Sequence, residues 1–551
     1  MTNEARCRGE RLLTVRGLMI EARTKESGWQ KIVHGVDLDL DRGEVLGLIG
    51  ESGAGKSTIG LAALGYARPG CRITGGTILF DGIDLAVANE KTKQKLRGAR
   101  IAYVAQSAAA AFNPAYRLID QYAEAAIRHG LMSRAKAYED AKALYRRMQL
   151  PDPDNIGFRY PHQVSGGQLQ RAMTAMAMAC RPDLIIFDEP TTALDVTTQI
   201  DVLASIKDVI RQFHTAAIYI THDLAVVAQM ADRIQVLQHG RTVEVAPAAT
   251  MITAPKENYT RSLWAVRHME KPEQPPVDAG LVPLLSVRGV CAAYRQGPKV
   301  LNDISFDMHR GRTMAVVGES GSGKSTLARV IAGLLPPVQG DILMDGGVLP
   351  PGMNERGMGD RQRIQIIYQM ADTALNPRQR IGDIIGRPMA LYLGLKKAAI
   401  RARVSRLLEM IELPKTYIDR YPYELSGGQK QRIGIARALA AEPQLVICDE
   451  VTSALDQLVA EGILKLLMDL RQEMKLSYLF ITHELATVKA IADDVIVMRH
   501  GHIVDAGGKA AVLTAPRQDY TRTLLASVPA MDTGWLDKIL IARKSRLSAE
   551  G

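Results

Sequence analysis

The feature that most constrains the fold of this chain is an internal repeat. The run GLIGESGAGKST from Gly47 returns as AVVGESGSGKST from Ala315, and RYPHQVSGGQLQR from Arg159 returns as RYPYELSGGQKQR from Arg420. LIIFDEPTTALD and LVICDEVTSALD follow in the same order, and then ITHDLA and ITHELA. A set of motifs that recurs in fixed order marks a repeated structural unit, and 551 residues exceed what one core usually serves. The sequence therefore predicts two tandem domains of one fold.

The spacing of the repeats predicts the domain boundaries. Lys56 and Lys324 are 268 residues apart, whereas the later motifs are 261 apart, which predicts a surface-loop deletion of seven residues in the second copy. The segment from His268 to Pro283 is rich in proline and charge, as in a short linker. The predicted parts are a first domain over residues 1–267, a linker over 268–283, a second domain over 284–534 and a tail over 535–551. The tail is expected to be a frayed surface helix rather than a membrane anchor.

Composition places the chain among globular proteins. Hydrophobic residues make up 47% of it and charged residues 23%, which excludes the disordered and fibrous classes. The net charge of +10 does not by itself distinguish between an anionic ligand, a membrane surface and a nucleic acid as the partner. No stretch approaches eighteen uncharged apolar residues, and charges interrupt the N-terminal MTNEARCRGERLL where a secretory signal needs an apolar core. The five cysteines form no CxxC pair, so we expect reduced thiols and no zinc or iron-sulfur site.

Short apolar runs next to the motifs predict buried strands. They are Val45–Ile49, Ile101–Ala105, Leu184–Phe187 and Ile218–Ile220, each with a counterpart in the second half. Runs of this length that alternate with helical segments are typical of strands buried on both faces. The sequence therefore predicts an α/β fold with a largely parallel sheet in each domain.

Two glycine-rich loops predict phosphate binding. Each matches GxxxxGK[ST] between an apolar strand and a helical pattern. In such a loop the backbone N–H groups surround phosphate oxygens, the lysine neutralises the β- and γ-phosphates, and the serine after it can ligate magnesium. The predicted phosphate-binding residues are Gly50, Ser52, Gly53, Gly55, Lys56, Ser57 and Thr58, and in the second copy Gly318, Ser320, Gly321, Gly323, Lys324, Ser325 and Thr326.

An acidic pair closes a four-residue apolar strand in each half. The pairs are Asp188-Glu189 and Asp449-Glu450, and their position is the sheet edge where ligands of such folds lie. The aspartate would hold magnesium, and the glutamate would polarise the water that attacks the γ-phosphate. Acidic pairs are common at strand ends, so this interpretation depends on the P-loops upstream.

A serine-glycine-glycine-glutamine sequence opens a helical segment in each half, at Ser165 and at Ser426. Hydroxyl and free N–H groups at the positive end of a helix suit an anion. A helix cap followed by two glycines is the plainer interpretation. Against it stands the order of P-loop, tetrapeptide and acidic pair, which appears twice.

In this order the motifs resemble the Walker A, signature and Walker B motifs of ABC-type nucleotide-binding domains, over nearly all of both halves. The resemblance implies two tandem P-loop NTPase domains, each with a mainly parallel sheet core, an antiparallel β subdomain and a helical subdomain. It implies that the chain is an ATPase with ATP and Mg²⁺ as cofactors. Every motif is intact twice, so both sites are expected to hydrolyse ATP, which argues against a regulatory module with dead sites.

The resemblance also implies roles outside these motifs. Gln106 and Gln369 match the Q-loop, which senses the γ-phosphate and contacts membrane subunits, Asp195 and Asp456 match the D-loop, and His222 and His483 match the switch histidine. The implied catalytic residues are Glu189, His222, Glu450 and His483. The implied metal ligands are Ser57, Gln106, Asp188, Ser325, Gln369 and Asp449. The further nucleotide-binding residues are Gln106, Ser165, Gly167, Gln168, Tyr294, Gln369, Ser426, Gly428 and Gln429.

The resemblance implies two composite sites, each between the P-loop of one domain and the signature of the other. One departure concerns the aromatic residue that stacks on adenine. Tyr294 suits this role in the second half, but the aligned residue in the first half is Ala22, where Trp29 is a candidate substitute.

Smaller repeated signals point to one branch of the family. APKENYTRSLW from Ala254 returns as APRQDYTRTLL from Ala515, and FNP from Phe112 returns as LNP from Leu375. These resemble oligopeptide, dipeptide and nickel importer ATPases, and the fused arrangement is similar to that of glutathione and peptide importers. The resemblance implies a peripheral protein at the cytoplasmic face of the bacterial inner membrane. Its expected partners are two transmembrane permease subunits and an extracytoplasmic solute-binding protein, with a peptide as the leading solute and no nucleic acid.

Two absences in the sequence bear on this branch. Some relatives carry a cysteine cluster beyond the Tyr-Thr segment, but no cysteine lies between Tyr259 and Cys291 or after Cys448, so no iron-sulfur cluster is expected. The alternative is a soluble tandem ABC ATPase that acts on ribosomes or nucleic acid. Those relatives have a long charged helical linker, whereas this linker is short and bears proline.

Overall fold

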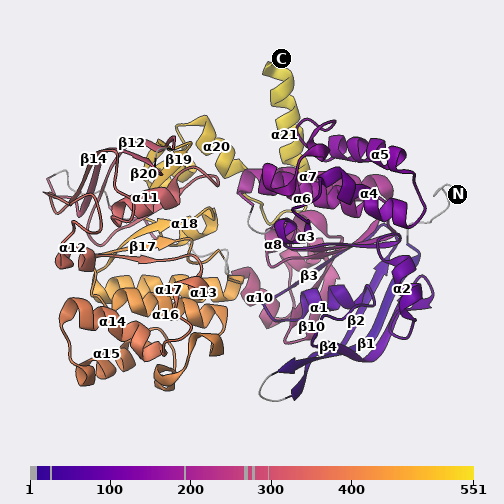
Figure 1. Ribbon diagram of the computed structural model, residues 1–551, viewed down its shortest axis with the longest axis horizontal. Coiled ribbons are helices and arrows are strands. Elements are labelled where there is room, and N and C mark those ends of the chain that lie inside the picture. Colours follow the sequence, from indigo (N-terminus) through magenta and orange to yellow (C-terminus); the bar gives the residue numbers. More distant parts are fainter. Residues whose placement is uncertain are drawn as a thin grey trace. The chain divides into compact units, whose positions relative to one another are not determined.

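The computed structural model describes residues 9–24, 28–191, 194–265, 271–275, 280–295, 297–453 and 455–550. The chain divides into two units, one made of Met1–Ala265 with Pro529–Gly551 and the other of Val266–Val528. Each unit contains one larger and one smaller sheet with helices packed around them (Figure 1). The domain boundaries expected from the sequence at residues 267, 283 and 534 stay predictions.

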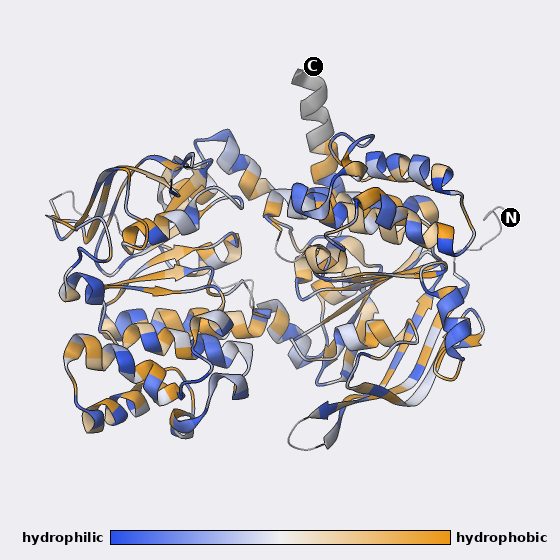
Figure 2. Ribbon diagram, in the orientation of Figure 1, coloured by the Kyte–Doolittle hydropathy of each residue, from blue (hydrophilic) through white to orange (hydrophobic). Residues whose placement is uncertain are grey.

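The larger sheet of the first unit carries the motifs. Its order is β10-β9-β3-β8-β7-β6, with parallel pairing except at β10. Its strands are β3 (Val45–Gly50), β6 (Ile101–Val104), β7 (Leu184–Asp188), β8 (Ala216–Ile220), β9 (Arg233–Gln238) and β10 (Arg241–Pro247). β3, β7 and β8 are buried along their whole length, and Figure 2 shows orange, the colour of apolar residues, among the strands inside this unit. The predicted, largely parallel sheet is therefore confirmed. The sequence could predict it because runs that are apolar at every position need cover on both faces.

The smaller sheet of the first unit is antiparallel, in the order β2-β1-β4-β5. Its strands are β1 (Arg11–Thr24), β2 (Gly28–Asp41), β4 (Cys71–Phe80) and β5 (Ile83–Asp84). Along the second part of β2, buried and more exposed residues alternate, as expected for a sheet with one face on the core. That face packs with the helix after the P-loop into one apolar core.

The helices of the first unit flank the larger sheet and form a helical subdomain. They are α1 (Lys56–Ala62), α2 (Glu90–Leu96), α3 (Ala108–Ala111), α4 (Leu118–Arg128), α5 (Arg134–Arg147), α6 (Gly166–Ala177), α7 (Val196–Phe213), α8 (Leu224–Met230), α9 (Ala248–Thr253) and α10 (Asn258–Ala265). In the subdomain α4 and α5 pack through Tyr122 and Tyr145, whose rings meet edge to face at 5.8 Å. The first predicted signature helix, which begins after Ser165, is confirmed as α6.

The second unit repeats this architecture. Its sheets have the orders β12-β11-β14-β15 and β16-β17-β18-β13-β19-β20. The strands are β11 (Leu285–Ala293), β12 (Lys299–Met308), β13 (Thr313–Val317), β14 (Gln339–Met344), β15 (Gly347–Val348), β16 (Ile364–Ile367), β17 (Leu445–Asp449), β18 (Ser477–Ile481), β19 (Asp494–Arg499) and β20 (His502–Gly508). The helices are α11 (Lys324–Ile331), α12 (Met358–Arg363), α13 (Ala371–Ala374), α14 (Ile381–Leu393), α15 (Lys397–Met410), α16 (Gly427–Leu439), α17 (Gln457–Met474), α18 (Leu485–Ile491), α19 (Lys509–Thr514) and α20 (Asp519–Ala526).

The difference in length between the copies lies partly in strands. β4 has ten residues and its counterpart β14 has six. The additional residues of β4 pair with the end of β1, with Cys71 opposite Ala22 and Arg72 opposite Glu21. Paired backbone groups satisfy one another, so the longer β1–β4 strand pair of the first unit is regular structure. The expectation of a surface-loop deletion alone was therefore too simple.

The C-terminal tail packs on the first unit. The tail helix α21 (Trp535–Glu550) buries Leu536 completely in the apolar core that contains α7 and β7. The buried amide of Gln229 donates to the carbonyl oxygens of Ala530 and Asp532 at 2.8 Å each, and it accepts the N–H of Leu536 at 3.0 Å. The expectation of a frayed surface helix was wrong for the start of this segment, because one face of the helix is apolar enough to be buried.

Candidate functional site

The P-loop of each unit joins a buried strand to a helix. It runs from the end of β3 to α1 in the first unit and from β13 to α11 in the second, and Ser52, Gly53 and Gly55 lie in the first loop as predicted. Gly50 has a φ of 148°, and a Cβ there would lie 2.1 Å from the carbonyl oxygen of Leu237. Gly318 has the same conformation, with a Cβ 2.2 Å from the oxygen of Met498. Only glycine fits where the loop leaves the strand this close to another backbone.

The P-loop lysines fold back onto their own loops. The Lys56 ammonium donates to the carbonyl oxygens of Gly50 at 2.7 Å and Glu51 at 2.9 Å. Lys324 donates in the same way to Gly318 and Glu319, at 2.8 Å each. Both lysines are buried, so each loop holds a positive charge at its centre, where a phosphate would lie.

A serine and an aspartate meet at the end of each P-loop. The Ser57 hydroxyl donates to Oδ1 of Asp188 at 2.8 Å, and the Ser325 hydroxyl donates to Oδ1 of Asp449 at 3.0 Å. Hydroxyl and carboxylate oxygens are the hard ligands that Mg²⁺ prefers. The residues present therefore fit the predicted magnesium ion.

A glutamate, a histidine and a glutamine gather beside each of these pairs. Glu189 lies 3.1 Å from Nδ1 of His222, and its other carboxylate oxygen accepts the amide of Gln106 at 3.0 Å. In the second unit Glu450 lies 3.5 Å from Nδ1 of His483 and accepts from Gln369 at 2.8 Å. The three residue types come from a strand end and two separate loops. The fold brings them together in both units.

The backbone holds both glutamates in an unusual conformation. Glu189 has a φ of 50° and Glu450 a φ of 49°, a left-handed geometry that costs a non-glycine residue free energy. The N–H of Glu189 donates to the carbonyl of Ile220 at 2.9 Å, and that of Glu450 donates to Ile481 at 3.0 Å. Neighbouring strands thus impose the turn that points each carboxylate toward its histidine.

Both histidines, and Glu450 in the second unit, favour their charged forms. Burial lowers the pKa of His222, but the hydrogen bond to Glu189 and the negative charges of Glu189 and Asp223 together outweigh burial, so the pKa is raised overall. The hydrogen bond to Glu450 raises the pKa of His483, and the same bond lowers the pKa of Glu450. Burial raises the pKa of Asp449. Each pair is therefore an acceptor and a donor that hold one another in place.

The signature residues lie at helix starts, away from the hydrogen bonds of the P-loop. The Ser165 hydroxyl accepts the N–H of Gln168 at 3.4 Å, and the Gln168 side chain accepts the N–H of Ser165 at 3.1 Å. Ser426 and Gln429 form the same reciprocal cap on α16. A Cβ on Gly167 would lie 2.3 Å from a methyl of α7, so this glycine lets the two helices approach. The D-loop aspartates Asp195 and Asp456 cap α7 and α17.

The two units differ at the predicted adenine-stacking position. Tyr294 is 41% exposed, and its hydroxyl lies 3.3 Å from the Thr326 hydroxyl and accepts from Arg329 at 3.0 Å. In the first unit Ala22 pairs with Gln30, next to Trp29. Successive strand residues face opposite sides of a sheet, so Trp29 lies on the face opposite to Ala22. The Arg72 guanidinium stacks 4.1 Å over the Trp29 ring. Trp29 therefore does not take the place of Tyr294.

One residue of the first site was missed by sequence reasoning. The Tyr103 hydroxyl on β6 donates to Oδ2 of Asp188 at 2.5 Å, and Arg68 lies 4.0 Å from the same oxygen. Burial and the bond to Asp188 raise the pKa of Tyr103, which keeps the hydroxyl protonated as a donor. The aligned residue of the second unit is Ile366, which has no hydroxyl. The only sequence signal was a polar-ended aromatic residue in an otherwise apolar run.

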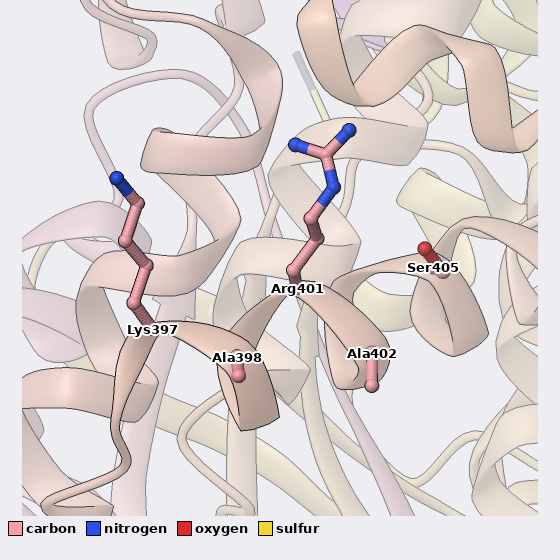
Figure 3. A pocket seen from close by; sticks show the side chains of 5 residues that line it. All are labelled: Lys397, Ala398, Arg401, Ala402 and Ser405. Carbon is pink, nitrogen blue, oxygen red and sulfur yellow. The ribbon is translucent and has the colours of Figure 1, made fainter.

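A cavity of about 600 Å³ lies on α15 in the second unit (Figure 3), lined by Lys397, Ala398, Arg401, Ala402 and Ser405. Lys397 and Arg401 are one turn apart and project in the same direction. Arg401 already pairs with Asp419 at 3.2 Å. None of the lining residues is a predicted site residue, so this hollow adds nothing to the nucleotide chemistry.

Comparison with known proteins agrees with the geometry of the site. A family model described as ABC transporter matches residues 33–192 and 301–453, which together make up more than half of the chain. The chain belongs to the ABC transporter family. A second model, described as the C-terminal region of oligopeptide/dipeptide transporters, matches residues 504–549. The resemblance inferred from the motifs is confirmed.

Relatives of this ABC protein are similar over nearly the whole length. The glutathione import ATP-binding protein GsiA of Escherichia coli strain K12 is 38% identical, over 91% of this chain and 88% of that protein. That of Salmonella typhimurium strain LT2 is also 38% identical, over 95% and 90%. A solved structure, cbiO1 from Clostridium perfringens, is 30% identical with a TM-score of 0.39, over 43% of this chain and 92% of that one.

The family and the site agree on the reaction. This ABC protein binds ATP and hydrolyses it to drive transport, and it is the ATP-binding subunit of an importer. Among the helices of the described residues, none has both the length and the apolar composition of a membrane span.

Proposed function

We propose that this ABC protein powers the import of a small peptide or a peptide-like solute into a bacterial cell. The observation that carries the proposal is similarity across nearly the full chain to proteins named for glutathione import. The match of the C-terminal region to oligopeptide/dipeptide transporters supports the same solute class. The alternative of a ribosome- or nucleic-acid-acting ATPase has no comparable support.

We further propose that the chain works at the cytoplasmic face of the inner membrane as a peripheral protein. Its partners are two transmembrane permease subunits and an extracytoplasmic binding protein that selects the solute. Segments beside Gln106 and Gln369 would contact the permeases, because these glutamines hydrogen-bond the glutamates of the reaction and lie in exposed loops.

The proposed reaction uses one set of residues in each unit. Ser57, Asp188 and Gln106 would hold Mg²⁺, which would neutralise phosphate charge. Lys56 would bind the phosphates. Glu189 would accept the hydrogen bond of the attacking water, with His222 orienting it. The second site would use Lys324, Ser325, Gln369, Asp449, Glu450 and His483 in the same roles.

Each ATP is proposed to complete its site with the signature residues of the opposite domain. The hydrogen bonds described for Ser165 and Ser426 stay within their own helix starts. A Cβ on Gly166 or Gly427 would meet nothing within 4 Å, so these helix starts offer space for a ligand. Binding of ATP would close the two domains, and loss of the γ-phosphate would release them.

The test is uptake of radiolabelled glutathione and of a labelled dipeptide by cells that carry the chain or lack it. Glu189→Gln combined with Glu450→Gln should abolish uptake and turnover but preserve ATP binding, because the amides keep the shape and lose the charge. Undiminished ATP turnover in this variant would remove both glutamates from the reaction. Gentle solubilisation with a tagged chain should recover two multi-span subunits. Recovery of ribosomes in their place would refute the transport proposal.

A further inference from the structure

The repeated segment that contains Pro…Tyr-Thr-Arg has no role in the reaction as described so far. It covers Pro255–Ala265 with α10 in the first unit and Pro516–Ala526 with α20 in the second. We call each of them a strut segment. Each follows the edge strand of the larger sheet and a short helix, and the second lies within the region matched by the transporter C-terminal model.

Each strut segment is folded by its own arginine. Arg261 donates to the carbonyl oxygens of Pro255 at 3.1 Å and Lys256 at 2.6 Å. In the second copy Arg522 donates to the carbonyl oxygen of Pro516 at 3.3 Å. The arginine thus closes a turn with the proline six residues before it. This contact explains why the proline and the arginine recur together in both copies of the motif.

A carboxylate on the edge strand anchors each strut segment. On β10, Glu244 accepts the N–H of Lys256 at 2.9 Å. On β20, the aligned Asp505 accepts the hydroxyl of Thr521 at 3.1 Å. Thr260 and Thr521 lie in the first turns of α10 and α20 and are 0% and 1% exposed, so each helix begins with a buried threonine. The tyrosine just before it is therefore held in a defined position.

That tyrosine reaches the P-loop of its own unit. The hydroxyl oxygen of Tyr259 accepts the backbone N–H of Glu51 at 3.4 Å. The hydroxyl oxygen of Tyr520 accepts the backbone N–H of Glu319 at 3.3 Å. The contact joins segments about 200 residues apart, and it occurs in both units although the surroundings differ: Arg499 stacks 4.7 Å over Tyr520, where the first unit has Gln238.

The same P-loop residue is held on its other side by the lysine. The carbonyl of Glu51 accepts from Lys56, and that of Glu319 accepts from Lys324. If the lysine turns toward phosphate oxygens, these carbonyls lose their ammonium partner. The hydrogen bond from the N–H of this residue to the tyrosine hydroxyl remains, so the tyrosine can keep the start of the P-loop in place.

We propose that Tyr259 and Tyr520 are positioning residues for ATP binding, and that each strut segment couples the region after the catalytic core to its own P-loop. The inference rests on the proposed role of the P-loops. In the second unit, a segment within the region matched by the transporter C-terminal model would in this way influence the affinity of the P-loop for ATP.

The test is Tyr259→Phe combined with Tyr520→Phe, which removes two hydroxyls and keeps both rings. A net hydrogen bond is worth about 0.5–1.5 kcal/mol, so the dissociation constant of a fluorescent ATP analogue should rise about two- to tenfold. The turnover number at saturating ATP should change less than about twofold, because the hydroxyls touch no reacting atom. Amide exchange at Glu51 and Glu319 should become faster in the nucleotide-free protein.

Two further variants separate positioning from mere loss of a tyrosine hydroxyl. Thr521→Val removes the hydroxyl that donates to Asp505 without touching the P-loop, and it should weaken ATP binding in the same direction. Tyr66→Phe removes a hydroxyl just beyond α1 from a ring that is 40% exposed, and it should leave the affinity for the ATP analogue unchanged.

The outcomes distinguish this inference from the proposal on which it rests. If Lys56→Ala with Lys324→Ala retains ATP affinity, the P-loops are not the phosphate-binding sites, and the inference about the strut segments fails as well. If that variant loses ATP but the two Tyr→Phe changes alter neither affinity nor amide exchange, only the strut inference is overturned. A fall in thermal stability with unchanged ATP affinity would likewise reduce the tyrosines to a structural role.

Discussion

Substitution of Leu536 should release the C-terminal tail from the first unit. Its side chain is 0% exposed and packs in the core beside α7. A buried Leu→Ala change costs about 2–5 kcal/mol, because the transfer free energy is lost and a cavity remains. With about 1.4 kcal/mol per factor of ten, a loss of about 3 kcal/mol shifts the balance toward the released tail about a hundredfold.

An ion pair in the same segment provides the matched comparison. Asp537 lies 3.2 Å from the Lys207 ammonium and 3.7 Å from the Arg211 guanidinium, and its side chain is 46% exposed. Exposed pairs contribute about 0.2–1 kcal/mol, so Asp537→Asn should shift the same equilibrium less than about fivefold. Apolar burial, not charge, is therefore expected to hold the tail.

The assay is amide hydrogen exchange over residues 535–542 in the full chain. Exchange should become about a hundred times faster in Leu536→Ala and change little in Asp537→Asn, while β17 and β18 of the second unit keep their protection. If the two variants release the tail equally, or if Leu536→Ala leaves it protected, the burial argument is wrong.

Three more outcomes follow from contacts in the sites. Tyr103→Phe removes the hydroxyl that donates to one oxygen of Asp188 and leaves Arg68 near that oxygen. Loss of such a supporting bond should raise the Mg²⁺ concentration needed for nucleotide binding at the first site about tenfold, measured by titration with the second site disabled. Gly167→Ala places a Cβ 2.3 Å from a threonine methyl and should lower the melting temperature, whereas Gly166→Ala meets no atom within 4 Å and should melt closer to the wild type. The raised pKa of His483 contributes stability that is fully present below pH 6.5, the ordinary histidine value, and is lost as the pH rises through the raised pKa. The lowered pKa of Glu450 contributes stability that is present above pH 4.5, the ordinary glutamate value, and is lost as the pH falls through the lowered pKa. The loss of stability caused by His483→Ala, followed by thermal melts, should therefore be largest between pH 4.5 and pH 6.5.

The parallel sheets could be predicted from sequence because burial on both faces leaves a strong signal. The run Leu184–Phe187 became β7 with one further residue, Asp188, and the P-loop glycines lie where the strand turns into α1. The motif order located the site for a related reason: residues at the carboxyl ends of parallel strands meet at one edge of the sheet. His222 was added to the predicted site by the family resemblance, and its contact with Glu189 appeared only in the structure.

The tail and Tyr103 could not be placed in the same way. Trp535, Leu536, Ile539 and Leu540 form an apolar stripe at helical spacing, but basic residues among and after them obscured it, and the surface that it covers is formed by residues more than 300 positions earlier. Tyr103 needed the pairing of β6 with β7, which places its hydroxyl near Asp188. Such contacts depend on tertiary register, which local patterns do not contain.

The two sites share every motif but are supported differently. In the first, the Asp188 carboxylate is shared by Ser57 and Tyr103, whereas Asp449 has Ser325 and an isoleucine in the place of the tyrosine. In the second, an aromatic ring lies beside the P-loop helix, where the first has Ala22. The intact motifs argue that both sites can hydrolyse ATP. The different supporting residues argue that ATP binding at the first site depends more on the metal ligands, and at the second site more on contact with the adenine base.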